Sequence, residues 1–318
     1  MRTYLDFEKP IAELESKVAE LKTLAAEQRS VSIEEELAQL EARAREALEE
    51  AYADLSPWQK TQVARHPERP HFNNYVEGLI EDFTPLAGDR YFGEDQAILG
   101  GMGRLRGRSV MLIGHEKGSD TEGRIRHNFG MARPEGYRKA QRLMLLADRF
   151  SIPVVSLVDT AGAYPGIGAE ERGQAEAIAR CTDTCLAVGV PVVSVIVGEG
   201  GSGGAVAIAT ANRVYMLEHA IYTVASPEAA ASILWRDSTR AVDAATNMKI
   251  TAQDLLRLGV IDGIIPEPVG GAHRDGREVV SATGDVIAGA LAEFDGMRPE
   301  EIRKARRDKF LDIGRARQ

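Results

Sequence analysis

Two stretches of the chain share one design: an apolar, β-branched run, then a glycine-rich turn, then a helical pattern. The first run covers residues 153–159 and its turn 161–166, and the second run covers 190–197 and its turn 198–204. Strands that alternate with helices predict a largely parallel sheet that is buried on both faces. The fold class is therefore α/β, and the two neighbouring turns are expected to wall one pocket.

Other segments continue this alternation on both sides of the two turns. Further strand-like runs cover 97–101, 109–114 and 213–217, and helical patterns cover 137–150 and 170–188. Apolar runs of this length with helices between them extend the same sheet.

Both ends of the chain are predicted to be helical. Residues 10–54 are charged, and their apolar residues recur at spacings of three and four, which predicts two amphipathic helices with a break at 27–33. The narrow apolar stripe of this hairpin suits packing on the chain's own core or on another subunit, and its spacing does not choose between them. A charged helix is expected after Pro299.

The second turn, Gly198-Glu-Gly-Gly-Ser-Gly-Gly204, has five glycines in seven positions. Glycine is favoured where φ is positive or where a ligand approaches bare backbone N–H groups. A strand that enters a helix through such a turn directs those N–H groups toward negative charge. The loop therefore predicts oxyanion or phosphate stabilisation.

Two sequence motifs overlap in this turn. A G-x-G-x-x-G motif begins at Gly198, and Glu218 follows as a candidate ribose ligand, which is typical of dinucleotide binding. A G-x-S-x-G motif is centred on Ser202, and Asp262 and His273 follow in the chain order of an α/β-hydrolase.

A third interpretation needs no side-chain nucleophile. In it, Gly203 and Gly204 are paired amide donors and Ser202 is only a small turn residue. A tight packing turn between strand and helix, without any chemistry, is the fourth alternative.

Composition narrows the function classes. The chain of 318 residues carries 48 acidic and 39 basic residues, a formal net charge of −9. This charge argues against a nucleic-acid partner or an anionic-membrane surface and favours a small-molecule enzyme. The segment 117–142 is locally basic, and it forms either a solvated face or a surface for an acidic ligand or partner.

The cysteines and the N-terminal residues agree with this interpretation. Cys181 and Cys185 lie one helical turn apart, but no third and fourth ligand with familiar spacing accompanies them, so no metal is expected in this chain. Residues 1–10 lack the apolar core of a signal peptide, and no run of about 18 apolar residues occurs. The cytoplasm is the expected compartment.

Six segments, taken in chain order, form a more specific pattern than any one glycine motif. They are Asn128-Phe-Gly-Met131, Pro134-Glu-Gly-Tyr-Arg-Lys-Ala140, Gly162-Ala-Tyr-Pro-Gly166, Ala169-Glu-Glu-Arg-Gly-Gln174, Gly198-Glu-Gly-Gly-Ser-Gly-Gly204 and Ile265-Pro-Glu-Pro-Val-Gly-Gly-Ala-His-Arg274. Together they resemble the α subunit of the multisubunit bacterial acetyl-CoA carboxylase carboxyltransferase, and the resemblance covers nearly the whole chain.

The resemblance implies a crotonase-type fold of repeated ββα units with an N-terminal helical hairpin and a C-terminal helix. On that basis we expect an N-terminal helical region at 1–75, a carboxyltransferase core at 76–268 and a C-terminal helical extension at 269–318. The resemblance also implies assembly with a separate β subunit, which carries the family's zinc ribbon, into an α2β2 enzyme.

The implied reaction transfers a carboxyl group from carboxybiotin, held on a separate biotin carrier protein, to acetyl-CoA. The product is malonyl-CoA for fatty-acid synthesis, and ATP is used only in the separate biotin carboxylase step. Loss of CO2 leaves negative charge on the ureido group, which fixed N–H dipoles stabilise and which then takes a proton from the acetyl methyl group. No Ser-His-Asp triad is required. Another short acyl-CoA is an alternative acceptor, and a chain that only orders a catalytic partner is the non-enzymatic alternative.

The resemblance also implies residue roles. Gly203 and Gly204 are the expected catalytic amide donors. The expected substrate-binding residues are Gly162, Ala163, Tyr164, Pro165 and Gly166 in the first turn and Gly200, Gly201 and Ser202 in the second. By resemblance, the α subunit mainly supplies the biotin side of the site and the β subunit most of the CoA side.

The chain departs from the family pattern at a few positions. Ala161 stands where the family usually has proline, and Ala229 and Ala230 stand where it usually has glycine and cysteine. These departures concern local loop geometry and leave both catalytic glycines in place. The ring of Tyr164 either lines the pocket or simply packs.

Overall fold

The computed structural model describes residues 2–27 and 31–315. Within these ranges eight strands form one sheet, in the order β1-β2-β3-β4-β5-β6-β8, with β7 paired to β5. The strands are β1 (Ile80–Pro85), β2 (Ile98–Leu105), β3 (Arg108–His115), β4 (Val154–Thr160), β5 (Val192–Gly201), β6 (Arg213–Leu217), β7 (Ile221–Thr223) and β8 (Gly263–Ile265). The five strands expected from the sequence are thus confirmed as β2 to β6, and every residue of β4 and β5 is buried.

One edge of the sheet differs from the expectation of a largely parallel sheet. The pairs from β3 onward are parallel, as predicted, but β1, β2 and β3 are antiparallel. The cause is the connection of β2 to β3, in which Arg106 and Gly107 have φ of 49° and 78° while Leu105 pairs with Arg108. Two successive residues with positive φ form the tight hairpin turn that joins antiparallel strands.

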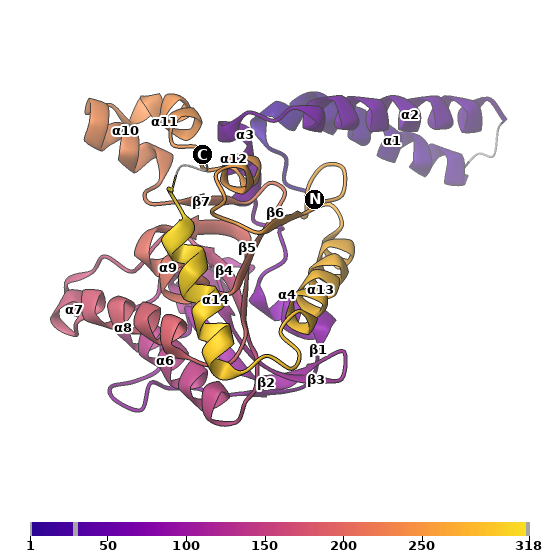
Figure 1. The fold of residues 1–318 in the computed structure, drawn as a ribbon. Coiled ribbons are helices and arrows are strands. Elements are labelled where there is room, and N and C mark those ends of the chain that lie inside the picture. Colours follow the sequence, from indigo (N-terminus) through magenta and orange to yellow (C-terminus); the bar gives the residue numbers. More distant parts are fainter. Residues whose placement is uncertain (1, 28–30, 316–318) are drawn as a thin grey trace.

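Helices cover both faces of this sheet. They are α1 (Lys9–Glu27), α2 (Val31–Ala53), α3 (Pro57–Ala64), α4 (Phe72–Leu79), α5 (Thr121–Arg126), α6 (Pro134–Arg149), α7 (Ile167–Glu171), α8 (Gln174–Ala187), α9 (Ser202–Ala209), α10 (Pro227–Trp235), α11 (Ala241–Asn247), α12 (Ala252–Arg257), α13 (Gly276–Ala292) and α14 (Pro299–Asp312). In Figure 1, α4 and α13 lie on one side of the sheet, and α6, α8, α9 and α14 lie on the other. Across the two described ranges, no helix is both long and apolar enough to cross a membrane.

The predicted N-terminal hairpin is formed by α1 and α2, which extend away from the sheet (Figure 1). The connection at 28–30, within the expected break, lies outside the described residues. The base of the hairpin packs on the chain itself: Tyr52 Oη donates to Glu8 (3.0 Å), and Arg274 pairs with Glu8 (3.2 Å) and Glu15 (2.7 Å). Contact of the outer turns with another subunit stays a prediction, as does the division into domains at residues 75 and 268.

The C-terminal helix α14 is fixed by one buried cation. The Arg306 guanidinium donates to the carbonyl oxygens of Cys185 (2.5 Å), Val188 (2.8 Å) and Val190 (2.7 Å) and to Asn212 Oδ1 (3.0 Å). Burial lowers the pKa of Arg306 to about 10, because these acceptors carry no full charge that would offset the lost hydration. These hydrogen bonds therefore hold α14 against the loop that leads into β5.

We expect Arg306→Met to lower the free energy of unfolding by about 3 kcal/mol or more, because several buried acceptors would lose a charged donor. Urea unfolding followed by circular dichroism measures the change. Arg307→Met, which alters the exposed neighbour on the same helix, is the matched control and should stay within about 0.5 kcal/mol of the wild type. Equal stability of the two variants would contradict the assigned role of Arg306.

Candidate functional site

The two glycine turns lie against each other at the carboxyl ends of β4 and β5. A Cβ atom added to Gly201 would stand 2.2 Å from the carbonyl oxygen of Ala161, and one added to Gly204 would stand 2.8 Å from the nitrogen of Ala163. Side-chain carbons do not approach backbone atoms this closely, so both positions require glycine. Gly162 also belongs to this contact, 2.9 Å from the added Cβ of Gly204. The structure therefore brings the predicted residues of the two turns together.

Helix α9 begins at Ser202, so Gly203 and Gly204 lie in its first turn. The first N–H groups of a helix have no partner within the helix, and the N-cap residue here, Gly201, has no side chain to bind them. Ser202 has φ of 54°, a left-handed conformation that turns the chain sharply from β5 into α9. The start of α9 thus offers backbone donors and the positive end of a helix dipole to an anion.

A cavity of about 580 Å³ opens along the outer face of α9. One wall consists of Ser202, Gly203 and Val206 from α9 and of Thr210, which follows this helix. The other walls come from β7, α12, α14 and nearby loops: Tyr222, Thr223, Val224, Met248, Lys249, Ile250, Leu255, Val260, Phe310 and Ile313. Most of these side chains are apolar, and the volume suits a small molecule. The first turn of α9 therefore borders a cavity with the size and lining that are typical of small-molecule sites.

The first glycine turn, residues 161–166, is held in place by Gln174 at the start of α8. Gln174 Nε2 donates to the carbonyl oxygen of Tyr164 (2.9 Å), and the Arg133 guanidinium lies 4.9 Å from the centroid of the Tyr164 ring. A Cβ atom added to Gly166 would stand 2.2 Å from the same ring, so the ring packs across this glycine. Of the predicted residues 200–204 in the second turn, only Ser202 and Gly203 line the cavity beside α9, and none of the predicted residues 162–166 in the first turn does. Their part in binding stays a prediction.

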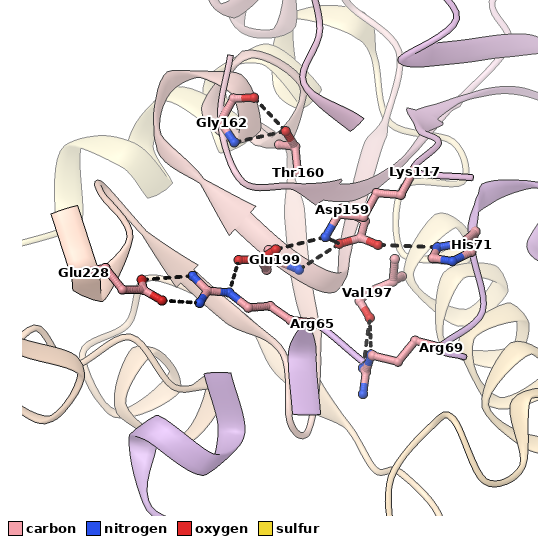
Figure 2. A network of polar contacts seen from close by, with 10 residues as sticks. All are labelled: Arg65, Arg69, His71, Lys117, Asp159, Thr160, Gly162, Val197, Glu199 and Glu228. Atoms are coloured by element: carbon pink, nitrogen blue, oxygen red, sulfur yellow. Dashed lines mark hydrogen bonds and ion pairs between the residues drawn. The ribbon is translucent and has the colours of Figure 1, made fainter. Parts of the chain in front are cut away.

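A buried ion network joins the ends of β4 and β5, and sequence analysis did not foresee it (Figure 2). Lys117 Nζ lies between two carboxylates, 2.7 Å from Asp159 Oδ1 and 3.0 Å from Glu199 Oε2. The backbone N–H of Glu199 donates to the same Asp159 oxygen (2.9 Å). Because Asp159 stands just before the first glycine turn and Glu199 is the second residue of the other, the network joins the starts of the two turns.

Charge balance keeps this network ionised. Burial alone would raise the pKa values of Asp159 and Glu199, but Lys117 outweighs burial and holds both pKa values below their usual range. Burial would lower the pKa of Lys117, and the two carboxylates raise it instead. Arg65 adds a second cation, 2.7 Å from Glu199 Oε1, and also pairs with Glu228 on α10 (2.6 Å). The network thus extends from β4 to α10.

A second buried pair anchors β5 itself. Arg69 Nη1 and Nη2 each donate to Glu267 at 2.8 Å, and Nε and Nη2 donate to the carbonyl oxygen of Val197 (3.2 and 2.9 Å), the contact drawn in Figure 2. Burial would raise the pKa of Glu267, but Arg69 lowers it to about 2. The backbone N–H of Glu267 donates to the Glu218 carboxylate (3.1 Å). Glu218, the candidate ribose ligand of the dinucleotide motif, therefore has a hydrogen-bond partner within the chain.

Among the described residues, the hydrolase triad is not assembled. Asp262 pairs with Lys309 of α14, and His273 stacks on His66 with ring centroids 3.8 Å apart. Neither Asp262 nor His273 lines the cavity to which Ser202 belongs. A serine without a histidine beside it lacks the base that such a nucleophile needs.

Comparison with known proteins gives a consistent result over the whole chain. A family model described as acetyl co-enzyme A carboxylase carboxyltransferase-like matches residues 4–314. The chain is 68% identical over 316 residues to the acetyl-coenzyme A carboxylase carboxyl transferase subunit alpha of Xanthobacter autotrophicus, covering 99% of this chain and 100% of that protein. It is 69% identical over 315 residues to the same subunit of Rhodopseudomonas palustris, covering 99% and 98%.

Solved structures show the same fold at low sequence identity. Transcarboxylase 12S, with methylmalonyl-coenzyme A and methylmalonic acid bound, has a TM-score of 0.60 and 20% identity, covering 76% of this chain and 45% of that one. A Pseudomonas malonate decarboxylase hetero-tetramer in complex with coenzyme A has a TM-score of 0.56 and 18% identity, covering 68% and 86%. The predicted crotonase-type α/β fold is confirmed.

Lys117→Met should lower the free energy of unfolding by about 3 kcal/mol at neutral pH, because two buried carboxylates would face each other without the cation between them. The loss should shrink as the pH falls. In the wild type, the two carboxylates have lowered pKa values, so their stabilisation of the folded form is lost in acid. In the variant, their pKa values rise, so protonation stabilises the folded form.

Urea unfolding between about pH 7 and pH 4 tests this expectation, with Lys304→Met as the control for loss of an exposed lysine. The control should differ little from the wild type at any pH. A stability gap for Lys117→Met that stays constant over this pH range would contradict the assigned network.

Proposed function

This chain belongs to the acetyl-CoA carboxylase carboxyltransferase α-subunit family, and we propose that its two glycine turns form the anion-stabilising half of that enzyme's site. The chain is the α component of a biotin-dependent carboxyltransferase that converts acetyl-CoA to malonyl-CoA. The observation that carries the proposal is the packing of the two turns, which leaves the first turn of α9 facing an apolar cavity.

The site fits a carboxylated biotin. Gly203 lies on the cavity wall, and the cavity of about 580 Å³ has room for a compact bicyclic ring and part of its arm. When bound, carboxybiotin supplies the carboxyl group and the base for the acetyl methyl proton. We assign its ring to the start of α9, beside Gly203 and Gly204.

The contribution of the chain is positioning and fixed dipoles. The N–H groups of Gly203 and Gly204 donate to the oxygen on which negative charge develops, and they need no reorganisation because β5 and α9 already hold them. The apolar walls, including Val206 and Phe310, exclude water and so strengthen these hydrogen bonds. Gly162 and Ala163 support the donors from behind through backbone contact.

Membership of this family implies a β-subunit partner, a biotin-carrying partner and an acyl-CoA substrate. We propose in addition that the β subunit carries the zinc ribbon and most of the CoA surface, that the assembly is α2β2, and that carboxybiotin arrives on a separate biotin carrier protein. The outer turns of α1 and α2 are the proposed contact with β. ATP use at the separate biotin carboxylase step, acetyl-CoA as the preferred acceptor and a cytoplasmic location belong to the same proposal.

The test is Gly204→Ala in the chain assembled with its β partner. The added methyl group would stand 2.8 Å from the Ala163 nitrogen and 2.9 Å from Tyr137 Oη, so the first turn of α9 must shift. We expect carboxyl transfer from carboxybiotin to acetyl-CoA to fall by roughly 10²-fold, the usual cost of losing an oxyanion donor.

Gly289→Ala is the matched control, since a methyl group there on α13 meets nothing within 4 Å. This variant should transfer carboxyl groups at the wild-type rate. If Gly204→Ala assembles with its partner and also retains the wild-type rate, the start of α9 is not the anion-stabilising element.

A further inference from the structure

A recess lined by arginines lies apart from the glycine turns, between the loop after β1 and helices α6 and α8. Its volume is about 710 Å³, and none of its lining residues belongs to the cavity beside α9. It is lined by Asp89, Arg90, Tyr91, Arg138, Gln141, Arg142, Leu145, Glu176 and Arg180. Two of its arginines, Arg138 and Arg142, belong to the basic segment that the sequence singled out and the proposed function does not use.

Two of these guanidinium groups bind only neutral acceptors among the described residues. Arg142 donates to the carbonyl oxygens of Gly88 (3.1 Å), Leu86 (3.2 Å) and Ala87 (3.1 Å). Arg90 donates to Ala87 as well (2.9 Å). Carbonyl groups orient a guanidinium without neutralising it, so both positive charges remain available to an anion.

A third guanidinium, that of Arg138, is only weakly compensated. Its Nη1 atom is buried without a hydrogen-bond partner in the described parts of the chain, and its distances to Asp89 Oδ2 and Glu135 Oε1 are both 3.9 Å. Asp89 accepts three backbone N–H groups through Oδ1, while its Oδ2 has no hydrogen-bond partner among the described residues, and Glu135 is bound by Arg172 (2.6 Å). A buried donor with no acceptor is costly, and a ligand oxygen would satisfy it.

The electrostatics of the recess agree with unneutralised charge. Burial and then the neighbouring Arg90 lower the pKa of Arg142, although Glu94 and Asp89 act in the opposite direction. Two guanidinium groups that repel each other across one recess are both stabilised when an anion lies between them.

An exposed aromatic ring adds a flat surface at the same place. Tyr91 is 84% exposed, and the Arg138 guanidinium lies 5.1 Å from its ring centroid. An aromatic ring stacked on a cation gives a rigid platform on which a planar apolar group of a ligand can rest.

We propose that this recess binds a phosphate-bearing ligand, with its phosphate oxygens on Arg90, Arg138 and Arg142 and any ring system on Tyr91. Guanidinium groups match phosphate oxygens by paired hydrogen bonds, which favours phosphate over a lone carboxylate. The site goes beyond the proposed function, and only its assignment to a CoA ligand rests on that function. Two sources carry this chemistry: the phosphorylated nucleotide end of the CoA substrate, or a free polyphosphate.

Calorimetric titration of the full chain with inorganic pyrophosphate and, separately, with adenosine 3′,5′-bisphosphate tests the site without any turnover assay. We expect saturable binding of at least one probe that weakens roughly tenfold in Arg90→Gln, the cost of one charge-assisted hydrogen bond. Arg277→Gln, an equal charge change at an exposed position of α13, should bind as the wild type does. A second variant, Arg142→Gln, should also weaken binding.

The two sources are separated with the chain assembled with its β partner. Tighter binding of the nucleotide, with a raised KM for acetyl-CoA and an unchanged kcat in Arg90→Gln, assigns the recess to the substrate's nucleotide end. Binding of pyrophosphate with an unchanged KM assigns it to a free polyphosphate. Absence of saturable binding by the wild type, or equal binding by both arginine variants and the control, would overturn the proposal whatever the enzyme's activity.

Discussion

The arrangement of the site depends on one buried cation, Lys117, held between Asp159 and Glu199. Two buried carboxylates this close would repel each other. The lysine lies between them and attracts both, so it links the neighbouring strands β4 and β5. The bridge stands near the carboxyl ends of β4 and β5, where the glycine turns begin. It therefore helps the β4–β5 ladder to hold the starts of the two turns close together.

Strand β5 is fixed by two buried cations. Just before the strand, Arg306 binds the carbonyl oxygen of Val190 (2.7 Å), and within it Arg69 binds that of Val197 (2.9 Å). Both guanidinium groups are buried, so movement of the strand would leave their charges without these hydrogen-bond acceptors. A strand held in this way presents the first turn of α9 in one position, which is what electrostatic preorganisation requires.

The glycine turns act through backbone atoms, and this explains why the site contains few polar side chains. Gly201 and Gly204 allow the second turn to touch Ala161 and Ala163 directly, and a methyl group at either position would prevent the contact. The side chains nearest the donors, such as Val206 and Tyr222, provide an apolar wall. In the proposed function, the chemistry beside this wall is supplied by a bound group and by the partner subunit.

Much of this organisation follows from the sequence, because it is local. The apolar runs that became β4 and β5, the glycine turns after them and the hairpin of α1 and α2 each rest on a pattern within a few residues. The antiparallel edge was missed, although the pair Arg106-Gly107 is a signal for a hairpin turn that could have shown it.

The ion pairs could not be predicted in the same way. Lys117 and Glu199 are 82 residues apart, and Arg69 and Glu267 are 198 apart. Charge alone does not indicate such partners, since the same residue types occur throughout the exposed helices. Only the packing of the sheet, which sequence patterns describe coarsely, decides which charges are buried together.

The central claim is that the backbone N–H groups of Gly203 and Gly204 face the bound biotin group. Selective 15N labelling of the 31 glycines, in the chain assembled with unlabelled β partner, allows each amide to be followed while biotin is added. The account predicts saturable downfield shifts of the Gly203 and Gly204 amide protons, as expected for new hydrogen bonds, while Gly289 stays unchanged. Saturable binding that shifts other glycines and leaves these two amides where they were would contradict it.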